Sequence, residues 1–406
     1  MKRTILLIII CLVVLTEFSS CDVIKRENRI NTTDGINTDG KKIYAIWVSY
    51  NELSMKSETD KSEKAFAEKA ENIMKNCNQN GFNRVIVQVR PFSDAFYRSE
   101  FFPFSEYLSG KQGVDPGYDA LKLLCDAAKR YNLKIDAWIN PYRVSYDTDY
   151  TKLSPDNPAV KLIEQGNNDD IIVLENGIFY NPASQKVQQL VLDGIREILE
   201  NYSIDGIHID DYFYPSRDES FDKNSYDAYI GNGGNLSLDN WRRSNVNTLV
   251  SLIYSTVKSY SQECLFTVSP CGDIDKNYND YYADVKLWLS ESGYCDIIMP
   301  QLYYGFNNEN KPFEKTLESW TELRKCDGVL LCPGLAFYKY KTSDRFAGSG
   351  SNEWLENEDI ISRQVSKILT NDKCNGFSLY SFSYIFDKNN DEICKKELQK
   401  IKNMLE

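Results

Sequence analysis

The chain has 406 residues, with 59 acidic and 47 basic side chains, so its formal net charge at pH 7 is −12. This negative balance makes nucleic acid a poor partner. The sequence contains one histidine and lacks an H-E-x-x-H motif, a G-x-S-x-G elbow, a phosphate loop and a dinucleotide fingerprint. We therefore expect no nucleic-acid partner, no cofactor and no metal.

The first 21 residues are typical of an export signal that ends in a lipid attachment site. Lys2 and Arg3 precede an apolar run at residues 5–15, and two serines precede Cys21. The run is shorter than the roughly 20 apolar residues of a membrane-spanning helix. A Cys directly after small residues is typical of lipoprotein processing. We predict that residues 1–21 are a lipoprotein signal peptide and that Cys21 anchors an exported protein to the cell membrane, facing the periplasm or the cell surface. Ordinary signal cleavage beside an incidental Cys is the alternative.

Residues 22–42 are polar and cannot bury an apolar face, which is typical of a flexible tether. No second change of composition follows, so we expect residues 43–406 to form one domain and the protein to be a monomer. Nine of the 11 cysteines follow the tether, and none has CxxC spacing. An odd number without that spacing favours small buried thiols over a disulfide framework or a metal site.

Apolar runs typical of strands alternate with helix-like segments along this domain. The expected strands cover residues 43–50, 84–91, 133–141, 205–212, 265–270, 295–304, 328–337 and 376–383. The expected helices cover residues 62–80, 118–132, 183–202, 241–261, 313–325 and 357–369. Such alternation indicates βαβ units and a parallel sheet.

Eight units of this kind predict an α/β protein with a (β/α)8 TIM barrel. The domain is longer than the roughly 250 residues of a typical barrel, so we expect extended βα loops. A doubly wound open sheet is the alternative, but no glycine-rich phosphate turn follows the first strand.

The fourth expected strand carries the most informative segment, DGIHIDDYFYP at residues 205–215. Alternate side chains of a strand lie on opposite faces, so His208 and Asp210 share one face and Asp211 lies on the other. Asp210 and Asp211 follow the apolar run at its carboxyl end, which is where a barrel places its chemistry. His208 is expected either to contact substrate or to form a hydrogen bond inside the barrel.

Other expected strands also end in polar and aromatic residues, and in a barrel these ends meet on one face. Aromatic rings pack on the apolar faces of sugars, while Asn, Gln, Arg and Asp can bind sugar hydroxyls. We therefore predict a saccharide site on this face. The candidate substrate-binding residues are Trp47, Arg90, Asp94, Tyr97, Trp138, Asn140, Tyr142, Arg143, His208, Tyr212, Gln301 and Tyr303.

Five motifs occur in order: QVRP at 88–91 with DAFYRSE at 94–100, AWINPYR at 137–143, the segment at 205–215, WRR at 241–243 and PQ at 300–301. Over nearly all of residues 43–390 they resemble the glycosyl-hydrolase-like 10 family, also known as DUF187. The resemblance implies a (β/α)8 barrel in an exported bacterial lipoprotein that acts on cell-wall glycan, including peptidoglycan strands without peptides. Two positions depart from the family's pattern, since Tyr303-Tyr304 follows the sixth strand and Asp136 stands where relatives often have His.

Glycoside hydrolysis needs two carboxyl groups that flank the scissile bond. The spacing of His208 and Asp210 is similar to that of α-amylase-like barrels, which suggests Asp210 as nucleophile or transition-state stabiliser. The catalytic candidates are Asp210 and Asp211. Besides Asp211, the second carboxylate could come from Asp94, Asp136, Glu100 or Glu52.

The sequence thus predicts a surface-tethered glycoside hydrolase whose partner is a glycan. Two alternatives stay open. One is a non-catalytic glycan-binding lipoprotein on the same barrel. The other is a metal-dependent polysaccharide deacetylase, because Asp210 and Asp211 could hold Mg²⁺ or Ca²⁺.

Overall fold

The computed structural model describes residues 42–406 except 167–168 and 389–390. The predicted signal peptide, Cys21 and all but the last residue of the predicted tether lie outside the described residues. Within the described part of the chain, no helix combines the length and apolar character needed to cross a membrane.

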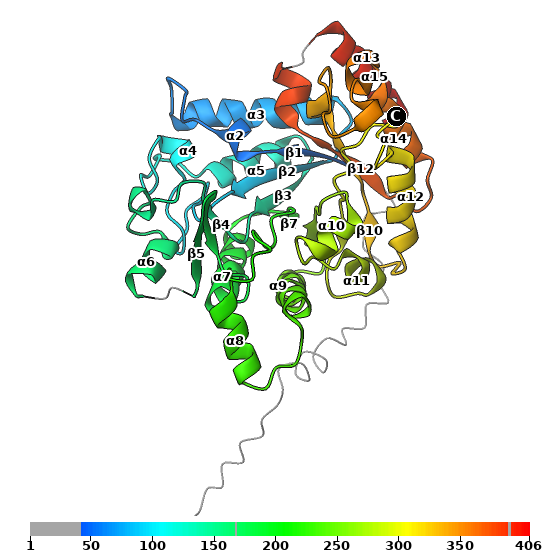
Figure 1. Ribbon diagram of the computed structural model, residues 1–406. Helices are drawn as coiled ribbons and strands as arrows, with labels where there is room; N and C mark the ends of the chain where they lie inside the picture. Colours follow the sequence, from blue (N-terminus) through cyan, green and yellow to red (C-terminus); the bar gives the residue numbers. More distant parts are fainter. Residues whose placement is uncertain (1–41, 167–168, 389–390) are drawn as a thin grey trace, which may run out of the picture. The chain divides into compact units, whose positions relative to one another are not determined.

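A curled parallel sheet organises the described part of the chain (Figure 1). Its order is β10-β9-β8-β7-β3-β2-β1-β12-β11. The predicted α/β class is confirmed, and each of the eight expected runs contains a strand. The strands are β1 (Ile43–Val48), β2 (Arg84–Arg90), β3 (Lys134–Ile139), β7 (Gly206–Ile209), β8 (Leu265–Val268), β9 (Ile297–Ile298), β10 (Leu330–Leu331), β11 (Gly334–Ala336) and β12 (Gly376–Tyr380).

The seventh expected strand is divided into β10 and β11 by Cys332 and Pro333. Proline has no N–H to donate to a neighbouring strand, which explains an interruption here. Cys332 N donates to Ile298 O at 2.9 Å, and Ser378 N donates to Pro333 O at 3.0 Å. The terminal strands of the sheet order are therefore consecutive segments of one run, and the sheet curls back on itself.

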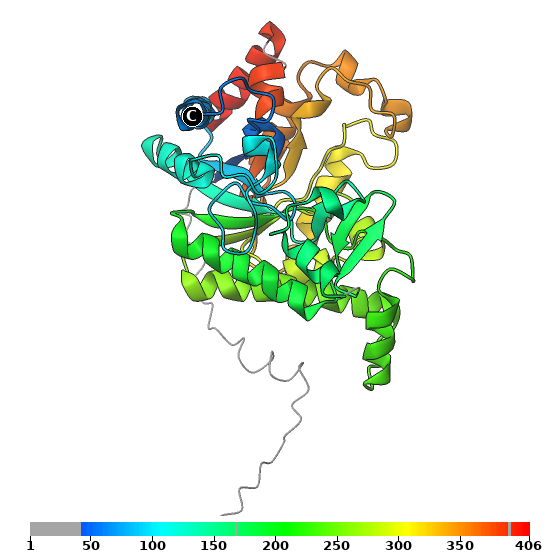
Figure 2. The same cartoon turned by 90° about the vertical axis from the view of Figure 1, so that its left-hand side faces the viewer.

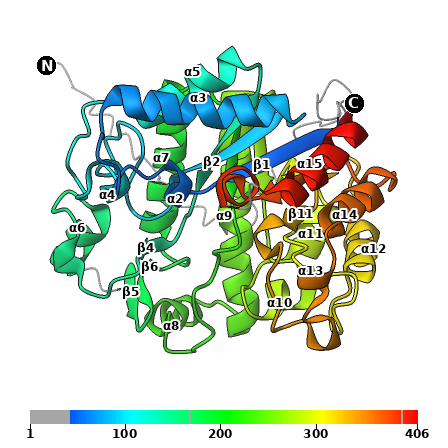
Figure 3. The same cartoon turned by 90° about the horizontal axis from the view of Figure 1, so that it is seen from above.

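Helices lie around the strands when the structure is seen from above (Figure 3). All six expected helices form, and four of them begin at a Ser or Asp whose side chain accepts a backbone N–H, as capping requires. Helices α7 and α9 run side by side (Figure 2). The six are α3 (Glu63–Gln79), α5 (Ala120–Arg130), α7 (Gln185–Asn201), α9 (Leu238–Tyr260), α12 (Phe313–Leu323) and α14 (Ile360–Leu369).

A three-stranded antiparallel sheet between β3 and α7 was not predicted from the sequence. It has the order β4-β6-β5 and consists of β4 (Arg143–Ser145), β5 (Ile171–Leu174) and β6 (Gly177–Tyr180). Eight further helices were also missed. They are α2 (Tyr50–Leu53), α4 (Glu106–Ser109), α6 (Pro158–Glu164), α8 (Lys223–Gly231), α10 (Ile274–Asn279), α11 (Val285–Ser290), α13 (Glu353–Glu356) and α15 (Glu392–Leu405).

The two faces of the curled sheet pack into two separate buried clusters. Ile207 and Ile209 belong to the large cluster that includes residues of the surrounding helices. Trp47 and Trp138 belong to a second, smaller cluster with residues of β1, β2, β8, β9 and β10. His208 contacts both tryptophan rings, so the predicted alternation of β7 is confirmed. In the described residues the nine cysteines are free thiols.

Candidate active site

Asp210 and Asp211 follow β7 directly, at the carboxyl end of the parallel strands. Asp210 is buried, with 4% of its surface exposed. Its Oδ2 accepts a hydrogen bond from Trp138 Nε1 at 3.1 Å, and its Oδ1 accepts one from the backbone N–H of Tyr212 at 3.2 Å. One donor lies on the neighbouring strand β3 and the other in the loop after Asp211, and together they fix the carboxyl group.

Beneath Asp210, His208 joins Trp47 to Thr267. Trp47 Nε1 donates to His208 Nε2 at 3.1 Å, so Nε2 must be the unprotonated nitrogen, and Nδ1 lies at hydrogen-bond distance from Thr267 Oγ1. Burial lowers the pKa of His208 to about 3. His208 is fully buried and both ring nitrogens are occupied. The prediction that it contacts substrate is therefore wrong, and it instead holds Trp47.

Arg143 lies between two exposed tyrosines. Its guanidinium carbon is 3.5 Å from the ring centroid of Tyr212 and 4.6 Å from that of Tyr146. Its Nη1 also donates to the hydroxyl of Tyr146 at 2.6 Å. Stacking of this kind immobilises a planar guanidinium and keeps its charge beside the two carboxyls.

A cavity of about 230 Å³ opens beside Arg143 and Tyr212. Asp211, Arg143 and Tyr212 line it, so they bring an anion, a cation and an aromatic ring to one space. Its other walls are Tyr142, Asn176, Phe179, Phe213, Tyr214, Pro215 and Tyr281.

Gln301 and three tyrosines come from the carboxyl ends of β9, β11 and β12 and lie near the carboxyl pair. Gln301 forms a hydrogen bond with Asp211, and its Nε2 also donates to Ser269 O at 3.1 Å. The ring of Tyr303 lies 6.2 Å from that of Tyr380 and 5.6 Å from that of Tyr338. Burial raises the pKa of Tyr303, and the charges of both aspartates raise it further.

The pKa values of both carboxyl groups are raised. Burial raises the pKa of Asp210, the charge of Asp211 raises it further, and Arg143 opposes both effects. Desolvation also raises the pKa of Asp211, against its hydrogen bond with Gln301 and the charge of Arg143. Two adjacent carboxyls resist being ionised together. The pair therefore retains a proton at a higher pH than an isolated aspartate does.

Arg90 and Tyr97 do not lie at this site, so their prediction as substrate-binding residues is wrong. The register between β2 and β3 shifts between Gln88 and Arg90, which turns Arg90 to the outer face. There its guanidinium packs on Phe102, 4.5 Å from the ring centroid, and fills the space left by the missing Cβ of Gly194. Tyr97 is fully buried.

Asp94, Asn140 and Tyr142 have mainly supporting positions. Asp94 is buried in the loop after β2, where its Oδ2 accepts from Gln112 Nε2 at 3.2 Å, and burial raises its pKa to about 7. Asn140 Oδ1 accepts the backbone N–H groups of Tyr142 and Arg143 at 3.2 and 3.0 Å. It thereby fixes the turn that presents Arg143. Tyr142 is buried but lines the cavity.

Asp136 and Glu52 are excluded as the second carboxylate by their contacts. Asp136 is fully buried near the start of β3 and forms an ion pair with Arg84, at the opposite end of the strands. Glu52 is the N3 residue of α2 and accepts from Ser49 N, Ser381 Oγ and Ser383 N. Both carboxylates hold the scaffold together.

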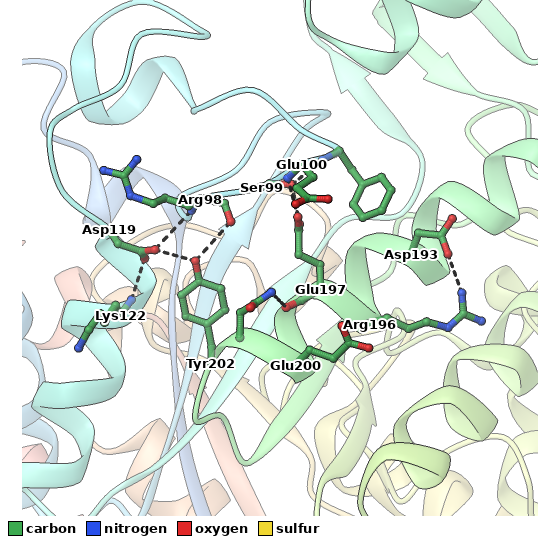
Figure 4. A pocket seen from close by; sticks show the side chains of 12 residues that line it. Arg98, Ser99, Glu100, Asp119, Lys122, Asp193, Arg196, Glu197, Glu200 and Tyr202 are labelled. Atoms are coloured by element: carbon green, nitrogen blue, oxygen red, sulfur yellow. Dashed lines mark hydrogen bonds and ion pairs between the residues drawn. The ribbon is translucent and has the colours of Figure 1, made fainter.

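Glu100 lies on the outer wall, beside a cavity of about 800 Å³ (Figure 4). Its backbone N–H and the hydroxyl of Ser99 both donate to Glu197 of α7. Tyr202 donates its hydroxyl to Asp119 at 2.6 Å in the same cavity. These contacts anchor the loop after β2 to the helices and keep Glu100 away from the strand ends. Asp211 is therefore the only one of the proposed partners that lies beside Asp210.

Tyr146, Tyr281 and Thr267 are among the site residues that the sequence did not predict. Tyr146 and Tyr281 come from the βα insertions, whose course could not be predicted, and Thr267 lies in the middle of β8. The alternation of β8 from Leu265 places Thr267 on the inner face, and this was the one available signal. Among the described residues, no group of three or more His, Cys, Asp or Glu side chains could hold a metal ion.

Comparison with known proteins identifies the family of the chain. Residues 42–348 match the family described as glycosyl hydrolase-like 10. The chain is 34% identical over 348 residues to glycosyl hydrolase YngK of Bacillus subtilis, covering 81% of this chain and 67% of that protein. It is 31% identical over 282 residues to glycosyl hydrolase DigH of Escherichia coli K12, covering 64% of this chain and 63% of that protein.

The fold is similar to that of α-L-fucosidase isoenzyme 2 from Paenibacillus thiaminolyticus. The TM-score is 0.59 and the identity 11%, with 90% of this chain and 49% of that one covered. The chain belongs to the glycosyl hydrolase-like 10 family and is, by that membership, an enzyme of the glycoside hydrolase class.

Proposed function

We propose that Asp210 and Asp211 carry out the hydrolysis of a bacterial cell-wall glycan. The observation that carries this proposal is the adjacent carboxyl pair at the end of β7, where Asp210 is buried and Asp211 lines a cavity with Arg143 and Tyr212. Burial raises the pKa of both carboxyl groups. Hydrolysis of a glycosidic bond needs one protonated and one ionised carboxyl group. A pair that keeps one proton near neutral pH supplies both forms at once.

The residues around the pair would bind the sugar on either side of the scissile bond. Arg143 and Gln301 would hold hydroxyl, N-acetyl or carboxyl groups, while Tyr212 and Tyr303 present aromatic rings. Trp138 orients Asp210 through its N–H. A protonated aspartate would then donate to the leaving oxygen as the second carboxylate stabilises or attacks the anomeric carbon.

Peptidoglycan strands without peptides are the proposed substrate. The fixed guanidinium of Arg143 beside a cavity of about 230 Å³ suits a sugar that bears a carboxylate. Incubation of the purified protein with such strands should release new reducing ends. Strands that stay intact over a long incubation, yet bind in a pull-down, would favour the non-catalytic glycan-binding alternative.

The metal-dependent deacetylase alternative needs more ligands than Asp210 and Asp211 supply in the described part of the chain. Its test is direct. Activity that survives a chelator, with reducing ends and no acetate as products, contradicts it.

We also propose that the curled sheet is a closed (β/α)8 barrel. Bridges from Cys271 to Gln301 and from Gln301 to Gly334 support this, as does the hydrogen bond of 2.8 Å from Asn375 N to Leu331 O. They link the strand ends and β12 across the interruption between β10 and β11.

Lipid attachment at Cys21 remains a proposal that rests on the sequence. β1 begins at Ile43, at the amino edge of the sheet, while the candidate site lies at the carboxyl edge. A tether that enters there would leave the site open to wall glycan. Replacing Cys21 by Ala should move the protein from the membrane fraction to the soluble one, and an unchanged distribution would contradict the anchor.

A further inference from the structure

A tract of aromatic rings extends from the candidate site along the loops after β1, β2 and β3. The ring centroids of Phe92 and Tyr146 are 5.1 Å apart, those of Tyr50 and Phe92 are 5.3 Å apart, and those of Tyr50 and Tyr107 are 4.7 Å apart. We refer to Tyr107, Tyr50, Phe92 and Tyr146 as the aromatic tract. Tyr50 follows β1, Phe92 and Tyr107 follow β2, and Tyr146 follows β4 in the insertion after β3, so three inter-strand segments converge to build it.

The aromatic tract is continuous with the cavity through Arg143. This guanidinium contacts Tyr146 at one end of the tract and Tyr212 in the cavity wall. Tyr146 is 55% exposed and Tyr212 is 42% exposed. An exposed ring gains little from burial, yet the hydrogen bond from Arg143 to its hydroxyl holds Tyr146 in place. A ring that is already ordered loses little entropy when a ligand stacks on it.

A second aromatic group lies at or after the carboxyl ends of β9, β11 and β12, whereas the aromatic tract follows β1, β2 and the insertion after β3; in the sheet order β7 lies between β3 and β9. Tyr303, Tyr338 and Tyr380 contact one another with centroid distances of 5.6–6.2 Å, and all three are partly exposed. The charges of Asp210 and Asp211 act on Tyr303. The carboxyl pair therefore lies between two sets of aromatic rings.

From this placement we propose that the protein binds a linear glycan across the carboxyl pair and cleaves internal bonds. Tyr146 forms a subsite beyond the sugar held in the cavity. Aromatic rings on both sides of the carboxyl pair can bind sugars on both sides of the scissile bond. Cleavage inside a chain needs sugars bound on both sides, whereas removal of a terminal sugar does not. The inference rests on the proposed glycan function and adds the length of the substrate and the position of the cut.

Oligosaccharides of increasing length, prepared from peptide-free glycan strands, test this inference. We expect Tyr146→Ala to lower kcat/KM about 3- to 10-fold for long chains, which is the worth of one stacked ring. The shortest cleaved oligosaccharide should be unaffected. Tyr146→Phe keeps the ring and should retain most of the long-chain activity. Tyr260→Ala is the matched control, because Tyr260 is 54% exposed at the end of α9, beside the amino ends of the strands and away from the candidate site.

Two results would overturn the inference. One is an equal loss on short and long chains, which would mean that Tyr146 acts only by positioning Arg143. The other is early product consisting only of terminal units. Binding of the same oligosaccharides to Asp210→Asn, with and without Tyr146→Ala, separates this inference from the hydrolytic function. A length-dependent loss of affinity without any cleavage by the native protein would refute hydrolysis but keep the tract as a glycan site.

Discussion

The indole N–H of Trp138 donates a hydrogen bond to Oδ2 of Asp210 across 3.1 Å. The contact crosses from β3 to the end of β7, where Trp138 is in register with His208. It ties the carboxyl group of Asp210, which directly follows β7, to the neighbouring strand β3, and rigid support of this kind is what acid–base chemistry requires.

Removal of the charge of Asp211 should change the titration of Asp210. Like charges raise one another's pKa, so Asp211→Asn should lower the pKa of Asp210. The carboxyl carbon of Asp210, assigned by its absence in Asp210→Asn, can be followed by NMR against pH. A pKa that stays the same in Asp211→Asn would show that burial alone controls Asp210.

The dependence of stability on pH should differ between the native protein and Asp210→Asn. Because the pKa of Asp210 is raised on folding, its contribution to stability is lost as pH rises from about 4 through the raised value. Asparagine does not ionise, so the difference in unfolding free energy should shift in favour of the variant by on the order of 1–3 kcal/mol between pH 4 and pH 8. Chemical denaturation measures this difference. A difference that is constant over that range contradicts the raised pKa.

We expect His208 to stabilise the fold and not to transfer a proton during the reaction. Its replacement by Phe leaves the buried N–H of Trp47 and the hydroxyl of Thr267 without their partner, at a cost of about 1–3 kcal/mol each. A pKa lowered to about 3 keeps the imidazole neutral above pH 4, so the shape of the pH–rate profile should not change. If the pH–rate profile of His208→Phe lost its rise or fall between pH 5 and 8, this would show that His208 transfers a proton.

The lowered pKa of His208 in the folded state also predicts how the stability of the protein changes with pH. It lies below the unfolded value of about 6.5, so stability should be lost as pH falls from there towards 3. In His208→Phe this acid sensitivity should be weaker, as urea denaturation at pH 7 and pH 4.5 can determine.

Asp136 should matter for folding alone. Its ion pair with Arg84 is buried, and leaving one partner of such a pair unpaired costs about 3–5 kcal/mol. Asp136→Ala should therefore lower the melting temperature, while kcat/KM per folded molecule stays at the native value. A loss of kcat/KM in a variant of native stability would place Asp136 in the reaction.

The sequence predicted the class of fold because hydrophobic runs and capping residues are local signals. Trp138, Asp210 and Arg143 were found because they lie at or shortly after the carboxyl ends of apolar runs. Arg90 was misplaced because a single shift of register after Gln88 reverses the face of a side chain. No local pattern records such a shift.

The aromatic tract could not be predicted either. Tyr146 lies in an insertion between β3 and α7 whose path is set by tertiary contacts, and its exposure appears only in the structure. Glu52 and Asp136 are polar residues on strands or next to them. Whether such residues serve the site or the scaffold depends on partners that are distant in sequence.

The central claim is that Asp210 takes part in hydrolysis, and the release of reducing ends from peptide-free glycan strands tests it most directly. Asp210→Asn should lower kcat by at least about 10²-fold, the lower end of what a positioned acid or base contributes. Glu100→Gln, on the outer wall, is the matched control and should keep native activity. Unchanged turnover by Asp210→Asn would contradict the account.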